Sequence, residues 1–233
     1  MSKRKTTLRQ AAPPPAERGA RQPVERDGRP PAEREARQPV EAIRAAAFAQ
    51  FAERGYPVVT VRDIMKACGL TQGALYNHFK SKDELLHDII ASTQGELERV
   101  CQQAVGGAGD DPRARLAAFV RVYVMRHCRL RVEALVANRE IGWLDPERVA
   151  DIRRSRRAIR DIVVGILAEG VEKGVFDPPQ VDGRRDLKAT AMALLDQCTH
   201  VSMWYGPGGE LGEEQMAKLY VDMALRAVGA RPQ

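Results

Sequence analysis

The feature that most constrains the fold of this chain is a glycine turn between two short helical segments, residues 61–68 and 72–79. Thr60 precedes the first segment as an N-cap, and Gly69 follows it, where a left-handed glycine ends a helix without steric cost. Thr71 is in position to cap the second segment only two residues later. Two short helices joined by so tight a turn follow the plan of a helix-turn-helix.

Two further helical patterns flank this turn. The pattern before it ends at Gly55 and has apolar residues at helical spacing, namely Val40, Ile43, Ala47 and Phe51. The pattern after it begins at Ser81, and Glu84 is placed to complete a capping box. Its apolar stripe is longer and consists of Leu85, Leu86, Ile89, Ile90, Leu97 and Cys101.

The remaining two-thirds of the chain also has helical periodicity, and no segment there alternates apolar and polar residues as a strand would. Breaks fall at Asp145-Pro146, Asp177-Pro178-Pro179 and the glycine-rich residues 206–209. Between the breaks we expect helices over residues 112–127, 130–141, 146–173, 184–204 and 212–228. The sequence therefore predicts an all-α fold.

The first 35 residues are rich in Pro, Arg, Glu and Ala and nearly lack large apolar side chains. Residues 14–25 recur at 30–41 with one difference, Gly19 against Glu35. Two polar copies cannot bury a shared core, so we expect a disordered, basic and Pro-rich tail over residues 1–35. The basic residues at the start of this tail either are solvated or reach into a DNA minor groove. They are Lys3, Arg4, Lys5 and Arg9.

The net charge of +6 is unevenly distributed along the chain. Residues 1–82 hold sixteen Lys and Arg against eight Asp and Glu, whereas the rest of the chain has a net charge of −2. A basic first part joined to a mildly acidic remainder predicts a polyanionic partner for the first part only. Charge alone does not distinguish a nucleic acid from an anionic membrane surface.

Residues 55–86, GYPVVTVRDIMKACGLTQGALYNHFKSKDELL, resemble the DNA-binding signature of the TetR family of transcriptional regulators. The resemblance implies an N-terminal three-helix helix-turn-helix domain over residues 36–82. It implies a larger helical domain for effector binding and dimerisation over residues 83–233. The implied function is that of a homodimeric repressor, which a small-molecule effector releases from a palindromic operator. An ordinary helical bundle is the alternative.

The chemistry of the second short helix supports this resemblance independently. Gln72, Gly73 and Ala74 put small or flexible side chains at its N-terminal end, which must enter a major groove about 12 Å wide. Gln72 suits two hydrogen bonds to adenine, whereas Tyr76 and His78 suit phosphate contacts, with a capping or packing role as the alternative for His78. The expected DNA-binding residues are Thr60, Arg62, Thr71, Gln72, Gly73, Ala74, Tyr76, His78 and Lys82.

The last two expected helices carry apolar stripes that serve either the core or a dimer interface. The resemblance favours an interface, because the last two long helices of each subunit form it in the TetR family, and paired helix-turn-helix proteins read two-fold sites. The expected interface residues are Leu194, Leu195, Cys198, Leu219, Tyr220 and Met223.

The larger domain also holds Met, Trp and Phe residues that suit the lining of an effector cavity, although each one alone is as suited to a core. The expected effector-binding residues are Phe119, Met125, Trp143, Met192, Met203 and Trp204. Candidate polar anchors in the same domain are Glu133, Asn138, Glu140 and His200.

Two further features bear on the identity of the effector. The arginines of residues 153–160 form either a solvated face or an anion site, since the apolar residues of that helix lie on its other side. Residues 201–220 resemble the corresponding part of TetR-type regulators of fatty-acid and steroid breakdown, several of which sense acyl-CoA thioesters. An acyl-CoA is therefore the expected effector class, and a multidrug-type ligand is the alternative.

Other classes of protein fit the sequence less well. We find no phosphate loop, GxSxG or HExxH motif, so an enzyme is not expected, and neither is a cofactor. The four cysteines are scattered without metal-ligand spacing, so we expect reduced core residues and no metal, with a redox-sensing thiol as the alternative. A non-specific architectural DNA protein would not need so large an acidic remainder. We expect a cytoplasmic protein, associated with the bacterial nucleoid through its operator.

Overall fold

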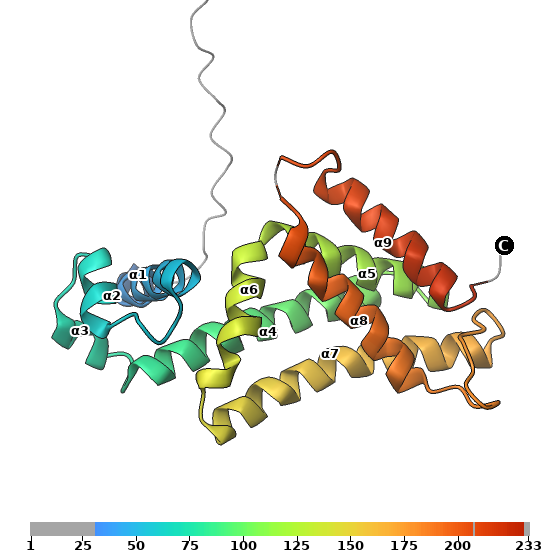
Figure 1. The fold of residues 1–233 in the computed structure, drawn as a ribbon, viewed down its shortest axis with the longest axis horizontal. Coiled ribbons are helices and arrows are strands. Elements are labelled where there is room, and N and C mark those ends of the chain that lie inside the picture. Colours follow the sequence, from blue (N-terminus) through green and yellow to red (C-terminus); the bar gives the residue numbers. More distant parts are fainter. Residues whose placement is uncertain (1–30, 207, 231–233) are drawn as a thin grey trace, which may run out of the picture.

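The computed structural model describes residues 31–206 and 208–230, with side chains from residue 39 onward. Figure 1 shows a small group of helices at one end, a long helix leading away from it and a larger bundle. The helices are α1 (Pro31–Arg54), α2 (Val61–Ala67), α3 (Gln72–Tyr76), α4 (Lys82–Gly106), α5 (Pro112–Arg129), α6 (Arg131–Arg139), the 3₁₀ turn η1 (Glu140–Trp143), α7 (Pro146–Glu172), α8 (Leu187–Trp204) and α9 (Glu213–Ala227). In these residues the one β-type pairing is a bridge between Val181 and Arg184, and no helix has the length and apolar character to cross a bilayer. The all-α prediction is confirmed.

The expected helices of the larger bundle are all present, with two differences. The expected helix over residues 130–141 is divided into α6 and η1. Helix α8 begins at Leu187 rather than near residue 184, because the Asp186 side chain caps it by accepting a hydrogen bond from Ala189 N at 2.9 Å.

The turn between α2 and α3 forms as the sequence predicts. Thr60 Oγ1 accepts a hydrogen bond from Asp63 N at 3.2 Å, and Asp63 Oδ2 accepts one from Thr60 N at 3.0 Å, which is a reciprocal capping box. Gly69 follows α2 with φ of +69°, where any other residue would be strained. Thr71 lies at the N-cap of α3, but its hydroxyl makes no capping bond within the described structure.

The start of α4 differs from the expected capping box. Ser81 Oγ accepts a hydrogen bond from Glu84 N at 3.0 Å, as predicted. The Glu84 carboxylate, however, reaches one residue further back and accepts from Lys80 N at 2.6 Å instead of Ser81 N. The turn after α3 is therefore tied to the first turn of α4.

Helix α1 begins at Pro31, four residues before residue 35, the expected end of the tail. Pro is favoured at the first position of a helix, and the Ala, Glu and Arg residues that follow it are good helix formers. The second copy of the duplicated segment thus enters the helix that its apolar continuation supports. Residues 1–30, which include the first copy, lie outside the described residues.

The buried apolar residues form two clusters, and α4 contributes to both. Its first half packs with α1, α2 and α3 in the smaller cluster, whereas its second half, from Leu97, packs in the larger bundle. The smaller cluster also contains Val136 of α6 and Ile152 of α7. The change from one core to the other therefore falls within α4.

Polar contacts also join α1 to its neighbours α4 and α6. Arg44 of α1 pairs with Asp88 of α4, with Nε 2.5 Å from Oδ2. Arg139 of α6 donates from Nη2 to the Phe51 carbonyl oxygen near the end of α1 at 2.6 Å. These contacts are partly buried, so they orient α1 against both α4 and α6 more effectively than surface ion pairs would.

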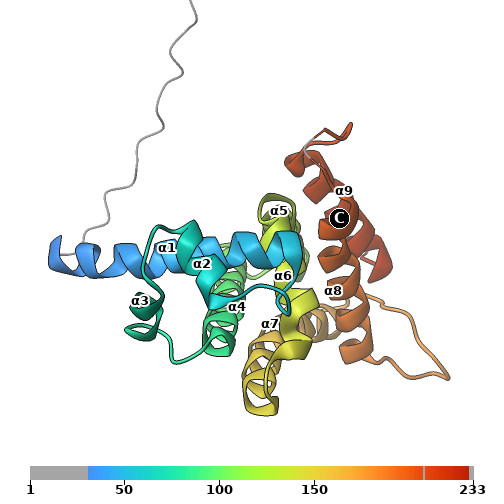
Figure 2. The same cartoon turned by 60° about the vertical axis from the view of Figure 1, so that its left-hand side comes forward.

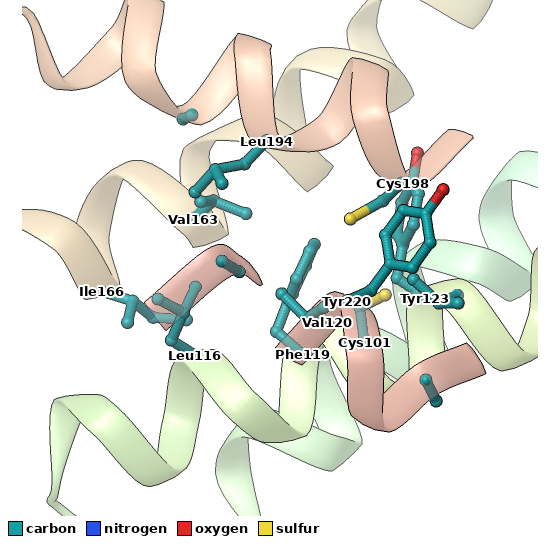
Figure 3. Packing of buried hydrophobic residues seen from close by; sticks show 14 of the residues in the cluster. Cys101, Leu116, Phe119, Val120, Tyr123, Val163, Ile166, Leu194, Cys198 and Tyr220 are labelled. Atoms are coloured by element: carbon teal, nitrogen blue, oxygen red, sulfur yellow. The ribbon is translucent and has the colours of Figure 1, made fainter. Parts of the chain in front are cut away.

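Helix α5 runs through the centre of the larger bundle, where Phe119, Val120 and Tyr123 pack against α7, α8 and α9 (Figure 3). The thiols of Cys101 and Cys198 lie in the same core, and burial raises the pKa of each to about 12. A thiol with so high a pKa is a poor nucleophile at neutral pH. This favours the core interpretation of these cysteines over a redox sensor.

The end of α7 is fixed by close packing of Phe176 on the helix. The Phe176 ring lies directly over Gly170, so that a Cβ added to this glycine would meet the ring at 2.0 Å. Phe176 itself is buried in the larger core. Gly165, on the same helix, has no atom within 4 Å of its Cβ position.

These two glycines give opposite predictions for stability. Gly170→Ala should lower the free energy of unfolding by about 2 kcal/mol, because the ring must leave its site in a packed core. Gly165→Ala should raise the free energy of unfolding by up to about 1 kcal/mol through helix propensity alone. Denaturant unfolding of both variants checks this. Equal effects of the two substitutions would contradict the packing of Phe176 on α7.

Candidate DNA-binding surface and effector cavity

The expected recognition helix α3 lies at the end of the molecule away from α9 (Figure 1). Leu75 and Phe79 are buried in the smaller cluster, as predicted, and fix the orientation of the helix. Gln72 and His78 are exposed, and Tyr76 is 56% exposed. An exposed tyrosine among polar residues is well placed for a phosphate contact.

The N-terminal end of α3 leaves room for close approach of a partner. Gly73 is exposed, and a Cβ added there would meet no atom within 4 Å. Ala74 is half-buried, so its methyl group is only partly available to a base. Thr71 is exposed beside it, and Thr60 and Arg62 are exposed at the start of the neighbouring helix α2. Except for Ala74, the expected contact residues of α2 and α3 thus lie in exposed positions.

Lys82 differs from the other expected contacts because its ammonium group already has partners. Lys82 Nζ donates to the carbonyl oxygens of Tyr56 at 2.9 Å and Val59 at 2.8 Å, and it lies 4.0 Å from the centroid of the Tyr56 ring. Partial burial lowers the pKa of Lys82. In this structure the side chain anchors the loop between α1 and α2, and a phosphate contact by its remaining N–H stays a prediction.

A cavity of about 430 Å³ lies between α4, α5, α6, α7 and α8. Figure 2 shows these helices in a second view. Its inner wall is made of buried residues, namely Gln94, Leu97, Tyr123, His127, Ala134 and Ile159. Its outer edge is made of exposed residues, namely Asn138, Arg153, Arg157, Met192 and Asp196. The volume is within the range of small-molecule sites, roughly 300–1,000 Å³.

Arginines dominate one side of this cavity. Arg153, Arg156, Arg157 and Arg160 of α7 line it together with Arg126 of α5. Arg154, by contrast, points elsewhere and pairs with Asp151 on its own helix. Of the two interpretations of this cluster, a solvated face or an anion site, its position at a cavity favours the anion site.

Two of these arginines are held by the protein itself. Arg156 Nη2 donates to the Ala137 carbonyl oxygen at 3.2 Å and to Asn138 Oδ1 at 2.9 Å, both on α6. Arg160 pairs with the adjacent Asp161. Burial lowers the pKa of Arg156 from a very high value, so the guanidinium remains charged at neutral pH.

Of the six expected effector-binding residues, only Met192 lines the cavity. Phe119 is buried in the larger core, and Met125 packs half-buried against it. Trp143 lies beside Tyr56, with ring centroids 6.4 Å apart, near the smaller cluster. Met203 and Trp204 are exposed at the end of α8. Residue type alone does not place such side chains at this cavity, because the same apolar residues also fill cores and surfaces, and the cavity lining combines apolar residues with arginines and other polar residues.

Of the expected polar anchors, only Asn138 lines the cavity. His200 is exposed, and Glu140 is buried next to Arg139, with Oε1 2.6 Å from Arg139 Nε. The sequence did not identify Gln94 or His127, because each is a single polar residue within an apolar helical face. That interruption was the available signal.

The six expected interface residues divide into inner and outer positions. Leu194, Cys198 and Tyr220 are buried within the protomer, so we do not retain them as interface residues. Leu195 is half-buried and lines the cavity. Leu219 and Met223 remain exposed on α9. Each of these two helices therefore has a core-facing side and an outer side.

Comparison with known proteins covers both parts of the chain. Residues 43–89 match the family model described as "Bacterial regulatory proteins, tetR family". Residues 109–228 match the model described as "Tetracyclin repressor-like, C-terminal domain". The HTH-type transcriptional repressor KstR2 of Rhodococcus jostii is 30% identical over 176 residues, which cover 75% of this chain and 83% of that protein.

Solved structures have the same fold. A bacterial regulatory protein in the tetR family from Rhodococcus RHA1 superposes with a TM-score of 0.76 at 30% identity, over 84% of this chain and 99% of that one. AibR, in complex with isovaleryl coenzyme A and operator DNA, superposes with a TM-score of 0.71 at 23% identity. That likeness covers 82% of this chain and 98% of AibR.

Substitutions on α2 and α3 should separate phosphate contacts from base contacts. Arg62→Ala should weaken binding to all DNA sequences, because one phosphate contact is lost in each protomer. The slope of log affinity against log salt concentration should become shallower by about one per protomer. Gln72→Ala should relax preference at one symmetric pair of positions, by about 1–3 kcal/mol. Titrations of selected and scrambled DNA at several salt concentrations measure both effects. Unchanged affinity and slope for Arg62→Ala would remove this surface from the interface.

A charge on the outer side of α9 should prevent dimerisation if this side forms the interface. Met223→Glu should weaken self-association roughly a hundredfold, because burying an unpaired carboxylate costs about 3 kcal/mol or more. Ala168→Glu, at an exposed position of α7, is the matched control. Analytical ultracentrifugation measures the dimer fraction. An unaffected dimer in the Met223 variant would place the interface elsewhere.

Proposed function

Because this chain belongs to the TetR family of bacterial transcriptional regulators, we propose that it represses a palindromic operator and is released by an acyl-CoA thioester. Members of this family are DNA-binding regulators rather than enzymes, and they act as dimers. A dimer would place two α3 helices about 34–36 Å apart, so that both enter the major groove on one side of the DNA. The finer assignments rest on the features below.

The observation that carries the proposed effector is the meeting of arginines and apolar residues in one cavity. Arg153 and Arg157 lie at its exposed edge, whereas Leu97 and Ile159 lie deep within it. An acyl chain is stabilised by burial at about 25 cal/mol per Å² of apolar surface. Guanidinium groups bind phosphates through paired, charge-assisted hydrogen bonds. A molecule with an apolar end and a phosphorylated end fits both parts of the site.

The size of the cavity determines how such a ligand would lie. About 430 Å³ holds an acyl group and part of its pantetheine arm, but not a complete coenzyme A. The nucleotide phosphates would therefore remain at the edge, beside Arg153 and Arg157. This orientation needs no buried, unpaired charge, which would be costly.

Two related proteins support parts of the proposal. KstR2 of Rhodococcus jostii is named as a repressor, which supports repression over activation as the mode of regulation. AibR was solved with both isovaleryl coenzyme A and operator DNA, and at 23% identity it shares the fold alone. It supports the compatibility of this fold with an acyl-CoA, and no residue-level inference is taken from it.

Helix α6 provides a route from the cavity to the DNA-binding helices. Arg156 reaches from the cavity to the Ala137 carbonyl and the Asn138 side chain, and the next residue, Arg139, donates to the Phe51 carbonyl of α1. A phosphate that binds Arg156 would compete with its bonds to α6. The ligand releases DNA only if it binds the conformation with the non-operator spacing more tightly than the DNA-bound one.

Calorimetry with acyl-CoAs, the free acids and coenzyme A alone tests the proposed effector. The double variant Arg153→Ala/Arg157→Ala should bind acyl-CoA at least about tenfold more weakly, since hydrogen bonds to charged groups contribute about 1.5–3 kcal/mol each. Arg154→Ala is the matched control on the same helix and should bind as the wild type does. Arg139→Ala should retain ligand affinity and release DNA less completely.

The alternative effector is an uncharged drug-like molecule. Tight binding of such a compound, together with no response to any thioester, would reject the acyl-CoA proposal in favour of a multidrug-type sensor. It would leave the assignment of the DNA-binding surface unaffected.

A further inference from the structure

The inner wall of the cavity contains two polar side chains that an unsubstituted acyl chain could not satisfy. Gln94 of α4 is 8% exposed and His127 of α5 is 6% exposed, and both line the cavity. A buried polar group without a hydrogen bond costs about 1–3 kcal/mol. A purely hydrocarbon ligand would displace water from both groups without forming hydrogen bonds to replace those lost.

The Gln94 amide is free to bind a ligand. Within residues 39–206 and 208–230, no group hydrogen-bonds to this side chain. It interrupts the apolar face of α4 between Ile90 and Leu97, where an aliphatic residue would pack against the same neighbours. An amide supplies two N–H donors and one carbonyl acceptor. The position therefore offers hydrogen bonds to whatever occupies the cavity.

The His127 ring is held in one tautomer and one orientation. Its Nδ1 lies 2.8 Å from the Tyr123 carbonyl oxygen, which only accepts, so Nδ1 carries the proton and donates. Burial lowers the pKa of His127 to about 4, so the ring is neutral and Nε2 is an acceptor. The ring stacks on Tyr123 with centroids 4.3 Å apart, and Tyr123 Oη lies 2.9 Å from Thr199 Oγ1.

Among the residues that the structure describes, no group donates a hydrogen bond to His127 Nε2. Unlike His87 Nε2, which is fully buried and has no partner, His127 Nε2 is not fully buried. A ligand carbonyl cannot fill this role, because a carbonyl has no proton to donate. A hydroxyl can fill it, because its proton can be donated to His127 Nε2 and a hydroxyl oxygen can also accept from an amide such as that of Gln94.

We infer that the effector carries a hydroxyl group on its acyl part, which Gln94 and His127 recognise at the inner wall of the cavity. This inference rests on the proposed acyl-CoA effector and narrows it to hydroxylated acyl thioesters. The arginines bind the phosphorylated end and are shared by every acyl-CoA. The two inner residues distinguish a hydroxylated chain from a saturated chain of the same length.

Calorimetry of the full-length protein with matched ligands tests the inference. The ligands are decanoyl-CoA and two hydroxydecanoyl-CoAs, one with the hydroxyl near the thioester and one with it at the chain end. One of the hydroxylated thioesters should bind at least about tenfold more tightly than decanoyl-CoA, because the saturated chain leaves both inner residues unpaired.

Variants at the inner wall should reverse this preference. Gln94→Leu should weaken binding of the preferred hydroxylated thioester about tenfold and strengthen binding of decanoyl-CoA. His127→Phe keeps a ring of similar size and should act in the same direction. Gln103→Leu, at an exposed position on α4 outside the cavity, should leave the ratio of affinities unchanged. Thermal melting without ligand confirms that each variant is folded.

The outcomes separate this inference from the function on which it rests. Equal affinities for saturated and hydroxylated thioesters, unchanged in Gln94→Leu, would overturn the hydroxyl inference and leave the acyl-CoA proposal intact. Absence of binding to any thioester would overturn both. A hydroxyl preference that survives in Gln94→Leu and His127→Phe would also overturn it, because other residues would then provide the recognition.

Discussion

The structure depends on the apolar stripe of α4, which contributes to both cores. Leu85, Leu86, Ile89 and Ile90 pack with the short helices, and Leu97, Cys101 and Val105 pack in the larger bundle. The same helix thus belongs to two cores at once. Because helical hydrogen bonds make such a segment stiff, displacement at one end is carried to the other rather than absorbed in a flexible linker. A change in the bundle can therefore alter the position of α3.

Helix α6 adds a second, polar connection to this apolar one. Its Ala137 carbonyl accepts from Arg156 at the cavity, while Arg139 donates to the end of α1. Hydrogen bonds can exchange partners more readily than a packed stripe can slide. We therefore regard α4 as the common frame and α6 as the element whose contacts a ligand can change, in keeping with a two-state element that both sites influence.

The local structure of the DNA-binding part could be predicted from the sequence. The lining of the cavity could not, because it depends on tertiary contacts. Gly69, Leu75 and Phe79 were placed correctly because caps, turns and helical period depend on neighbours in the chain. The bonds of Lys82 to the α1–α2 loop join residues more than twenty positions apart, and no local pattern encodes them. The position of His127 at the cavity was not predicted, because the cavity forms only where five helices meet.

Gly73 has a consequence for how this protein can change over time. It lies near the N-terminal end of α3, and a Cβ added there would meet no atom within 4 Å. Packing within the protomer therefore does not exclude a small side chain at this position, whereas DNA bound against α3 would contact it. A single substitution at Gly73 could therefore change the preferred operator without altering the packing of the rest of the protomer.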